Sequence, residues 1–434
     1  MHKRNDAAVM DSQQGSRTAS DPGMYRWVVS ALLMGGGAIN IQARLIIFPL
    51  VPLLKPDFGL SDVQTSLLMT VFLWTYAICS PLAGYAGDRW SRRLVLIGSL
   101  AGSMVMTLVA AAAGSVGFLL ASRVLLGPVQ GFYIPASMAI LGDYNQRASR
   151  GKVFALVNAG NFVGSILVVA AAGWIGEKYG WRVALTAFAA FGALYCLMLF
   201  YWLRDIPPGA SDAPEATPTG PPPSFFPALL RLACIPSFLC LGLVSGITAV
   251  GTWMLSTWLP VFLSESFKMS LAESGVWGSL ATTGASFVGA LGGGILSDFV
   301  SARVPARRML LFTVFLMLAA PFPLVFSNAG NVQVALGAIA GFMIFRSLGE
   351  SNWHLVMFDI VRPELRSTAT GVSNAFNCMM GGAGALFAGY YKESLGLQAI
   401  FGFVTFTIVF AALVLCLAYF VFLKRDLQRA APKP

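Results

Sequence analysis

Four ionisable side chains lie inside otherwise apolar stretches of this 434-residue sequence and are the first candidates for chemistry: Arg44, Arg123, Arg346 and Glu350. A planar guanidinium is a natural bidentate partner for a carboxylate or a phosphate. Arg44 is the single charged residue of its stretch, so we expect it to bind an anionic substrate. The alternative is an arginine that packs between helices and donates to backbone carbonyls.

A second cluster consists of Arg346, Glu350 and His354, which recur at a spacing of four residues. That spacing places the three side chains on one face of a helix. Glu350 is the one acid well inside an apolar stretch, and burial and a neighbouring charge both influence whether such a group is protonated. We expect Glu350, with Arg346 and His354, to take up and release a proton during function. The alternative is a permanent ion pair between Arg346 and Glu350.

The composition indicates the elements that must position these residues. Hydrophobic residues make up 56% of the chain and charged residues 11%, against about 25% charged residues in soluble globular domains. One helical crossing of a hydrocarbon core needs ~20 apolar residues. Apolar runs of this length fall near residues 27–53, 64–87, 94–113, 116–141, 153–175, 183–203, 236–263, 273–297, 309–327, 332–358, 367–391 and 398–423. We therefore predict an all-α integral membrane protein with 12 transmembrane helices, which excludes most soluble enzymes and nucleic-acid-binding proteins.

The twelve runs fall into two groups of six, separated by a proline-rich stretch. Seven prolines between Asp205 and Pro227 are typical of a disordered or polyproline linker. The predicted organisation is an N-terminal tail over 1–25, a six-helix bundle over 26–204, a linker over 205–231, a second six-helix bundle over 232–423 and a C-terminal tail over 424–434.

The basic residues predict the orientation in the membrane. If the N-terminus is inside, 21 of the 29 Lys and Arg residues fall in the tails and inward loops, 5 in outward loops and 3 within spans. This asymmetry follows the positive-inside rule and places both termini and the linker in the cytoplasm. It also accounts for the net charge of +10 without a nucleic-acid partner. The sequence has no Asn-x-Ser/Thr site, which favours a bacterial inner membrane.

Cofactor chemistry has no support in the sequence. The six cysteines lie in or beside the predicted spans and form no Cys/His metal-binding pattern. No Walker-type phosphate-binding loop, paired carboxylates or nucleophile triad occurs. We therefore expect no cofactor, no metal and no enzymatic activity, and we expect an ion or substrate gradient to supply the driving force.

An internal duplication relates the two halves. Residues 142–150 align with residues 358–366, because Asp359 follows Asp143 by 216 residues and Arg366 follows Arg150 by the same number. A second repeated pattern is Gly84-x-x-Gly87-Asp88-Arg89-x-x-Arg92-Arg93, echoed by Gly294-x-x-Ser297-Asp298 with Arg303, Arg307 and Arg308. Parallel repeats that meet at a central binding site are typical of transporters that move one half against the other.

The pattern from Gly84 to Arg93 resembles the signature of the major facilitator superfamily between its second and third helices, and the resemblance extends from about Tyr25 to Phe422. Three further patterns resemble the anion:cation symporter branch, with the spinster-like branch as its neighbour. They are Arg123-Val-Leu-Leu-Gly127-Pro-Val-Gln130-Gly131-x-x-x-Pro135, Gly180-Trp181-Arg182 and Trp258-Leu-Pro260.

This resemblance implies roles for several residues. The branch typically has a substrate-contacting arginine at the place of Arg44, and Arg123 corresponds to an arginine near the proton-coupling region; the alternative for Arg123 is a helix-end arginine bound to carbonyls. Acids that commonly take part in proton coupling are replaced here by Ala43 and Gln130. The resemblance also implies a conformational latch, whose members are Gly84, Asp88, Arg89, Arg92 and Arg93 with Asp298, Arg307 and Arg308 in the second half. For the basic residues of the latch, the positive-inside rule is the alternative explanation.

Polar and aromatic residues within the spans complete the predicted cavity, although most aromatic residues in such spans only pack. Amides in hydrocarbon require partners, so the repeat-related asparagines are the better candidates. The predicted substrate-binding set is Asn40, Arg44, Tyr76, Tyr133, Asn158, Asn161, Trp253, Asn352, Asn374 and Asn377.

We therefore predict a secondary transporter that moves a small organic anion, a carboxylate or sugar acid, by alternating access. The expected coupling ion is the proton, and the expected form is a monomer in the lipid bilayer. Two alternatives remain open: an exporter of a lipid-like or drug-like amphiphile, and a membrane receptor or sensor built on a transporter fold. A channel is disfavoured by the two-fold repeat with its central linker.

Overall fold

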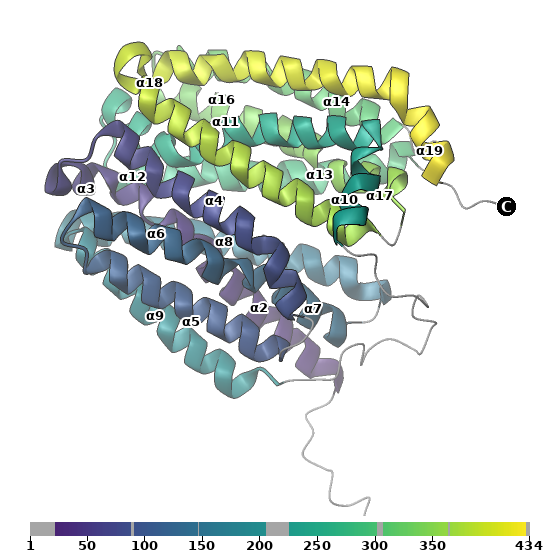
Figure 1. Cartoon of the computed structure of the whole chain (residues 1–434). Helices are drawn as coiled ribbons and strands as arrows, with labels where there is room; N and C mark the ends of the chain where they lie inside the picture. Colours follow the sequence, from purple (N-terminus) through teal and green to yellow (C-terminus); the bar gives the residue numbers. More distant parts are fainter. Residues whose placement is uncertain are drawn as a thin grey trace, which may run out of the picture.

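The computed structural model describes residues 22–87, 91–145, 147–204, 225–301, 307–362 and 365–430. The described residues are almost entirely helical, and their long helices run roughly side by side in two groups (Figure 1). The predicted all-α membrane fold is confirmed. Eleven continuous helical segments in the described part are long and apolar enough to cross a membrane.

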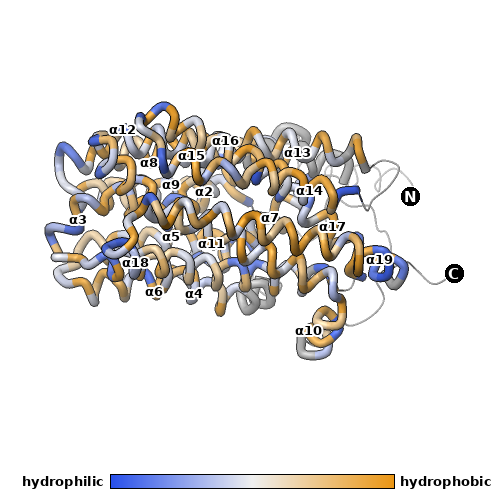
Figure 2. The backbone as a smooth tube through the Cα atoms, turned by 90° about the horizontal axis from the view of Figure 1, so that it is seen from above, coloured by the Kyte–Doolittle hydropathy of each residue, from blue (hydrophilic) through white to orange (hydrophobic). Residues whose placement is uncertain are grey.

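The N-terminal group consists of the helices that precede the linker. They are α2 (Pro22–Leu45), the 3-10 turn η1 (Phe48–Leu50), α3 (Val51–Phe58), α4 (Asp62–Gly87), α5 (Arg92–Ala111), α6 (Val116–Gly131), α7 (Tyr133–Tyr144), α8 (Arg147–Tyr179) and α9 (Trp181–Trp202). In the sequence, the short helix α10 (Phe225–Ala233) follows the first group and precedes the second. Figure 2 shows it outside the main bundle.

The C-terminal group follows α10. It contains α11 (Pro236–Phe267), α12 (Leu271–Ser279), the π-helical turn η2 (Leu280–Gly284), α13 (Ala285–Ser301), α14 (Arg307–Ala319), α15 (Phe322–Ser327), α16 (Val332–Glu350), α17 (Trp353–Ile360), α18 (Arg366–Leu417), the π-helical turn η4 (Ala418–Leu423) and α19 (Lys424–Ala430). We call the end of the molecule that carries α7, α10, α17 and α19 the linker end, and the end that carries α3 the hairpin end (Figure 1).

Helix α18 explains the difference between eleven segments and twelve predicted crossings. The last segment runs over 61 residues, Thr368–Gln428, or about 90 Å of helix, which is about three times the ~30 Å that one crossing requires. At Gly396 the backbone adopts φ 75° and ψ 154°, a left-handed conformation that glycine reaches without a steric cost. The chain reverses direction there, and Figure 1 shows two antiparallel yellow-green arms. The segment therefore supplies two crossings.

Several crossings are interrupted near their middle. The first breaks after Leu45, where Pro49 and Pro52 cannot donate to the preceding turn. The fourth breaks between α6 and α7, and the tenth breaks between α16 and α17. These last two crossings are repeat-related, so the interruption belongs to both halves. Broken crossings are tolerated within protein because neighbouring groups satisfy the freed backbone atoms.

The outer surface of the bundle is apolar along its length. Large hydrophobic side chains such as Ile295 and Phe406 are 73% and 65% exposed, and Figure 2 shows hydrophobic residues along the tube with hydrophilic ones concentrated at its two ends. Such a surface matches a hydrocarbon environment rather than water. The chain is therefore a multi-pass integral membrane protein.

Candidate functional site

The two halves meet through helices that approach each other closely. Thr70 Oγ1 on α4 donates to the carbonyl of Gly382 on α18 at 2.8 Å, and Trp74 Nε1 donates to the carbonyl of Met379 at 3.0 Å. A Cβ atom at Gly382 would lie 2.8 Å from Trp74 Nε1. Glycine at this position therefore permits the contact between the halves.

Arg44 lies at this junction, near the end of α2. Its Nη2 donates to Asn40 Oδ1 at 3.5 Å, and its guanidinium lies 5.4 Å from the ring centres of both Phe72 and Tyr76 on α4. Arg44 Nε is buried and has no hydrogen-bond partner in the described part of the chain. The two aromatic rings stabilise the cation through their faces, while the unused N–H capacity is available to an anion.

The opposite half contributes to the same place. The Tyr76 hydroxyl interacts with the side chains of Arg44 and of Asn374, and Arg44 also lies within electrostatic range of Cys378. Asn374 and Cys378 both belong to α18. Four of the predicted binding residues, Asn40, Arg44, Tyr76 and Asn374, are thus brought together between the halves. Among the described residues, no carboxylate forms an ion pair with Arg44.

Arg123 and Gln130 on α6 attach to the backbone of α2. Arg123, 1% exposed, donates from Nη1 to the carbonyl of Ala43 at 3.3 Å, and Gln130 Nε2 donates to the carbonyl of Asn40 at 2.9 Å. Ala43 directly precedes Arg44, and Asn40 lies one turn earlier on α2. The two bonds from α6 therefore fix the position of the helical turn that carries Arg44. Arg123 Nε and Nη2 have no partner in the described residues, so this buried cation retains unused donors.

The predicted proton-coupling cluster contains a close ion pair. Arg346 Nη2 lies 2.5 Å from Glu350 Oε2, and the two side chains are 10% and 42% exposed. The carboxylate therefore remains accessible although its partner is nearly buried. The side chain of His354 lies outside the described residues.

Three other predicted binding residues bond to nearby backbone. Tyr133 donates to the carbonyl of Leu33 at 3.4 Å, which ties α7 to α2. Asn377 Nδ2 donates to the carbonyl and the hydroxyl of Ser245 on α11, at 3.2 and 3.1 Å. Asn352, fully buried at the break between α16 and α17, donates to the carbonyl of Leu348 at 3.1 Å. The first two contacts join separate helices, whereas the third is local to the break between α16 and α17.

The remaining predicted binding residues have fewer described contacts. Trp253 is partly buried on α11 and lies against Gly381, where an added Cβ would meet its ring at 2.1 Å. Asn161 is partly buried on α8 near Gly37, and its Oδ1 has no described partner. The side chain of Asn158 lies outside the described residues.

Two of the predicted latch arginines form equivalent ion pairs, each with an acid outside the predicted set. Arg92 at the start of α5 pairs with Asp143 near the end of α7, and Arg308 at the start of α14 pairs with Asp359 near the end of α17 at 2.9 Å. Each pair lies within its own half. Arg93 donates to the carbonyl of Phe200.

Of the other predicted latch residues, Arg307 is exposed and Gly84 lies near the end of α4. Asp88, Arg89 and the side chain of Asp298 lie outside the described residues.

The sequence reasoning did not identify an ion cluster at the hairpin end. Lys392 Nζ on α18 lies 2.9 Å from Glu265 Oε1 on α11 and 3.4 Å from Asp62 Oδ1 on α4, while Lys55 Nζ lies 2.8 Å from the same Asp62 oxygen. Lys392 and Asp62 are only 11% and 8% exposed. The cluster bonds the two halves to each other at this end. No local pattern joins residues 330 positions apart, so only the positions of these residues at span ends could have suggested it.

Glu177 forms a second contact between the halves at the same end. Its carboxylate, near the end of α8, accepts from the backbone N–H of Leu271 at the start of α12. The N-terminus of a helix has unsatisfied N–H groups and a favourable dipole for such an acid. Every polar contact that the described residues make between the halves therefore lies either at the level of Arg44 and Tyr76 or closer to the hairpin end.

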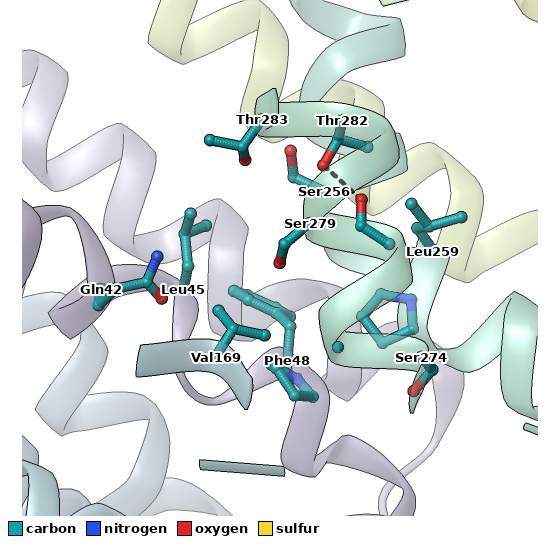
Figure 3. Close-up of a pocket in the computed structure, with 14 residues that line it drawn as sticks. Gln42, Leu45, Phe48, Val169, Ser256, Leu259, Ser274, Ser279, Thr282 and Thr283 are labelled. Atoms are coloured by element: carbon teal, nitrogen blue, oxygen red, sulfur yellow. Dashed lines mark hydrogen bonds between the residues drawn. The ribbon is translucent and has the colours of Figure 1, made fainter. Parts of the chain in front are cut away.

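A small pocket of about 70 Å³ also lies between the halves, on the α8 and α12 side (Figure 3). Its polar lining consists of Gln42, Ser256, Ser274, Ser279, Thr282 and Thr283. Gln42 precedes Arg44 by two residues on α2, and two helical residues that are two apart point to nearly opposite sides. The pocket and the Arg44 site therefore occupy different sides of α2.

Comparisons with known proteins agree with this architecture. The Major Facilitator Superfamily sequence model matches residues 33–385 and 243–434. Protein spinster homolog 1 of Bos taurus is 27% identical over 408 residues, covering 88% of this chain and 76% of that protein. The voltage-gated purine nucleotide uniporter SLC17A9 of Mus musculus is 25% identical over 412 residues, covering 91% and 88%.

The fold is also similar to that of a solved protein. The crystal structure of a bacterial homolog to the human lysosomal transporter spinster, in an inward-facing and unoccupied conformation, superposes with a TM-score of 0.77 at 23% identity and covers 96% of this chain and all of that one. The family match spans both halves and both repeats described above. This chain belongs to the Major Facilitator Superfamily.

Proposed function

We propose that this transporter moves a small organic anion across the membrane by alternating access, and that Arg44 binds the anionic group. The observation that carries the proposal is the environment of Arg44: a cation between the two halves, stacked near Phe72 and Tyr76, with a buried N–H that has no described partner. A planar guanidinium with free donors recognises carboxylate and phosphate groups. One relative is named as a purine nucleotide uniporter, and purine nucleotides are organic anions.

The proposed orientation has the linker end in the cytoplasm, in agreement with the distribution of basic residues. The described polar contacts between halves lie toward the hairpin end, which supports a state closed on the outer side. Transport then requires these contacts to break while the linker ends approach each other. The proposed location is a bacterial inner membrane, with the protein acting as a monomer.

We assign proton coupling to Glu350, in the place of the acids that Ala43 and Gln130 replace. Its carboxylate is 42% exposed while Arg346 beside it is nearly buried. A proton that binds Glu350 would weaken the ion pair and leave the Arg346 cation free to rearrange. Gln130 cannot take this role, since its amide does not titrate and donates to the backbone of α2.

The first experiment measures binding to purified protein by thermal shift. The ligands are simple carboxylates, sugar acids, phosphate esters, lysolipids and hydrophobic cations, each tested on wild type, Arg44→Ala and Arg44→Lys. Arg231→Ala on the exposed face of α10 is the control for a lost positive charge. Saturable stabilisation by a carboxylate or phosphate ester that Arg44→Ala abolishes supports the proposal. Equal binding by wild type and Arg44→Ala overturns it.

Export of an amphiphile is the second candidate, because Phe72 and Tyr76 give the Arg44 site an aromatic wall that also suits an apolar tail. The same ligand panel separates the two functions. Stabilisation by lysolipids or hydrophobic cations alone, independent of Arg44, favours export of an amphiphile.

Proton coupling is tested by uptake of the identified ligand into proteoliposomes under an imposed pH gradient. We expect Glu350→Gln to abolish acceleration by the gradient while exchange of ligand across the membrane continues. Unchanged acceleration in Glu350→Gln would leave the Arg346 and Glu350 pair as a fixed structural contact.

A further inference from the structure

Four charged residues form the ion cluster at the hairpin end, and their contacts divide unequally between the halves. Lys55 and Asp62 belong to the N-terminal half, and their side chains lie 2.8 Å apart. Glu265 and Lys392 belong to the C-terminal half and lie 2.9 Å apart. One contact, from Lys392 Nζ to Asp62 Oδ1, crosses between the halves, and at 3.4 Å it is the longest of the three. The pairs within each half are therefore closer than the pair that joins them.

The pair in the N-terminal half is held by its own chain segment. Lys55 lies on α3 and Asp62 begins α4, and the turn between them contains Gly59 at φ 60°. The backbone N–H of Leu60 donates to the carbonyl of Lys55 at 3.0 Å and closes this turn. Asp62 also lies at the N-terminus of α4, where the helix dipole favours a carboxylate. Asp62 therefore keeps a partner and a favourable position when the halves separate.

The C-terminal half holds Lys392 in a similar way. Trp258 and Glu265 are seven residues apart on α11, which places them on one face of that helix. Lys392 Nζ lies 2.9 Å from Glu265 Oε1 and 5.0 Å from the centre of the Trp258 ring. Helices α11 and α18 pack closely, since a Cβ atom at Gly384 would lie 2.8 Å from the Cα atom of Val250. The ammonium group thus has an anion and an aromatic face within its own half.

Closure of the hairpin end brings like charges together. The ammonium groups of Lys55 and Lys392 are neighbours, because both contact the same Asp62 oxygen. The carboxylates of Asp62 and Glu265 are neighbours in turn, because both contact Lys392 Nζ. Like charges at such separations repel. The one close attraction between the halves is therefore opposed by two repulsions.

The two outer charges attract each other only weakly. Lys55 and Glu265 form no ion pair among the described residues, and their side chains are 37% and 50% exposed. Solvent and salt screen an attraction between such groups. Asp62 and Lys392 are only 8% and 11% exposed, so screening is weaker at the centre of the cluster.

We propose that this cluster is a charge-balanced gate. The contact between Lys392 and Asp62 holds the hairpin ends together, whereas Lys55 and Glu265 oppose that contact and pair with the separated charges once the halves part. Neither central charge is then left without a partner, which avoids the large cost of an isolated buried charge. The inference rests on the alternating access proposed above, and it gives the two outer residues a role in opening.

The experiment measures hydrogen exchange of the full-length protein in lipid nanodiscs without added ligand. The double variant Lys55→Met/Glu265→Gln removes both outer charges and keeps the central pair. Opening would now separate two charges that have no other partner, so we expect exchange at the start of α4 (residues 62–70) and in α18 (residues 383–391) to slow by about threefold. This result is the opposite of the acceleration expected when Lys392 itself is removed.

Two controls separate this effect from local disturbance. Lys178→Met/Glu393→Gln removes one charge of each sign from residues at the same end that form no ion pair among the described residues, and it should leave exchange unchanged. Each single variant is read in the half that does not carry it. Lys55→Met should slow exchange in α18, and Glu265→Gln should slow it in α4.

Faster exchange in the double variant would show that the four residues act together as a clamp, and it would overturn the proposal. A rate equal to that of the control variant would also overturn it, because the outer charges would then have no influence on opening. The two single variants carry the same test if the double variant does not fold. Since no ligand is present, equal anion binding by wild type and Arg44→Ala would refute the proposed function without changing this result.

Discussion

Arg308 and Asp359 form an ion pair at 2.9 Å between α14 and α17, and each follows by 216 residues the corresponding member of the pair between Arg92 and Asp143. The duplication has therefore preserved a contact as well as a sequence pattern. In both halves the pair joins the start of one crossing to the linker end of the next, which makes each half a more rigid unit for alternating access.

The first prediction concerns this pair. We expect Asp359→Asn to lower stability by about 1–2 kcal/mol, because the side chains are only partly buried and the remaining arginine loses its counter-ion. A double-mutant cycle with Arg308→Met, read by thermal denaturation, measures the coupling between the two residues. Asp143→Asn should behave alike in the first half. Glu393→Gln, an exposed acid without a described ion pair, is the control, and a cycle with zero coupling would refute a stabilising contact.

The second prediction concerns the ion cluster at the hairpin end. Lys392→Met removes the cation that contacts both Asp62 and Glu265, and we expect the contact between α4 and α18 to open more often. Hydrogen exchange of the peptide that begins at Asp62 should accelerate. Lys178→Met, at the same end but without a described carboxylate partner, should leave that exchange unchanged. Equal protection in both variants would show that the cluster does not hold the halves together.

The third prediction uses a glycine contact between the halves. A Cβ atom at Gly389 on α18 would lie 2.0 Å from Ser66 Oγ and 2.6 Å from the carbonyl of Asp62. Gly389→Ala should therefore separate the helices at the hairpin end and lower Tm. Gly371→Ala on the same helix meets nothing within 4 Å and should be neutral or slightly stabilising. Comparable Tm values for the two variants would exclude close approach at Gly389.

The fourth prediction concerns acid stability at α3. Hydrogen bonds from Trp181 Nε1 and Arg182 Nη1, at 2.8 and 2.9 Å, hold the pKa of Asp57 below its ordinary value of 3.8. A lowered folded-state pKa contributes stability that is complete above the unfolded-state pKa and is lost as the pH falls through the folded-state value. Wild type should therefore lose this contribution below about pH 4.

Asp57→Asn removes the titrating group, and its stability should depend less on pH over the same range. Tryptophan fluorescence during unfolding at pH 6, 4 and 3 provides the measurement. Parallel pH profiles of wild type and Asp57→Asn would contradict the assignment to Asp57.

The sequence predicted the crossings and the repeat because both are local or periodic properties. The segment Thr368–Gln428, continuous in the structure, is predicted as two crossings because the sequence shows two separate apolar runs, 367–391 and 398–423. The breaks after Gly131 and Glu350 were not predicted, because an apolar run looks the same whether its helix is continuous or broken.

The candidate site was partly predictable for a related reason. Arg44 stands out because a charge in an apolar run is rare and costly. Its neighbours Phe72 and Cys378 did not stand out, because they belong to other crossings and resemble ordinary packing residues. The ion pair of Asp62 with Lys392 depends on which helices of the two halves are adjacent, and single-sequence periodicity carries no such information.

The reversal at Gly396 has a consequence for biosynthesis. The two arms of α18 are joined by a turn centred on Gly396, so their ends at this turn stay side by side. Each arm satisfies its own backbone polar groups as an α-helix once it enters hydrocarbon. We therefore expect the two arms to enter the bilayer as a helical hairpin, because the short connection keeps either arm from moving far from the other.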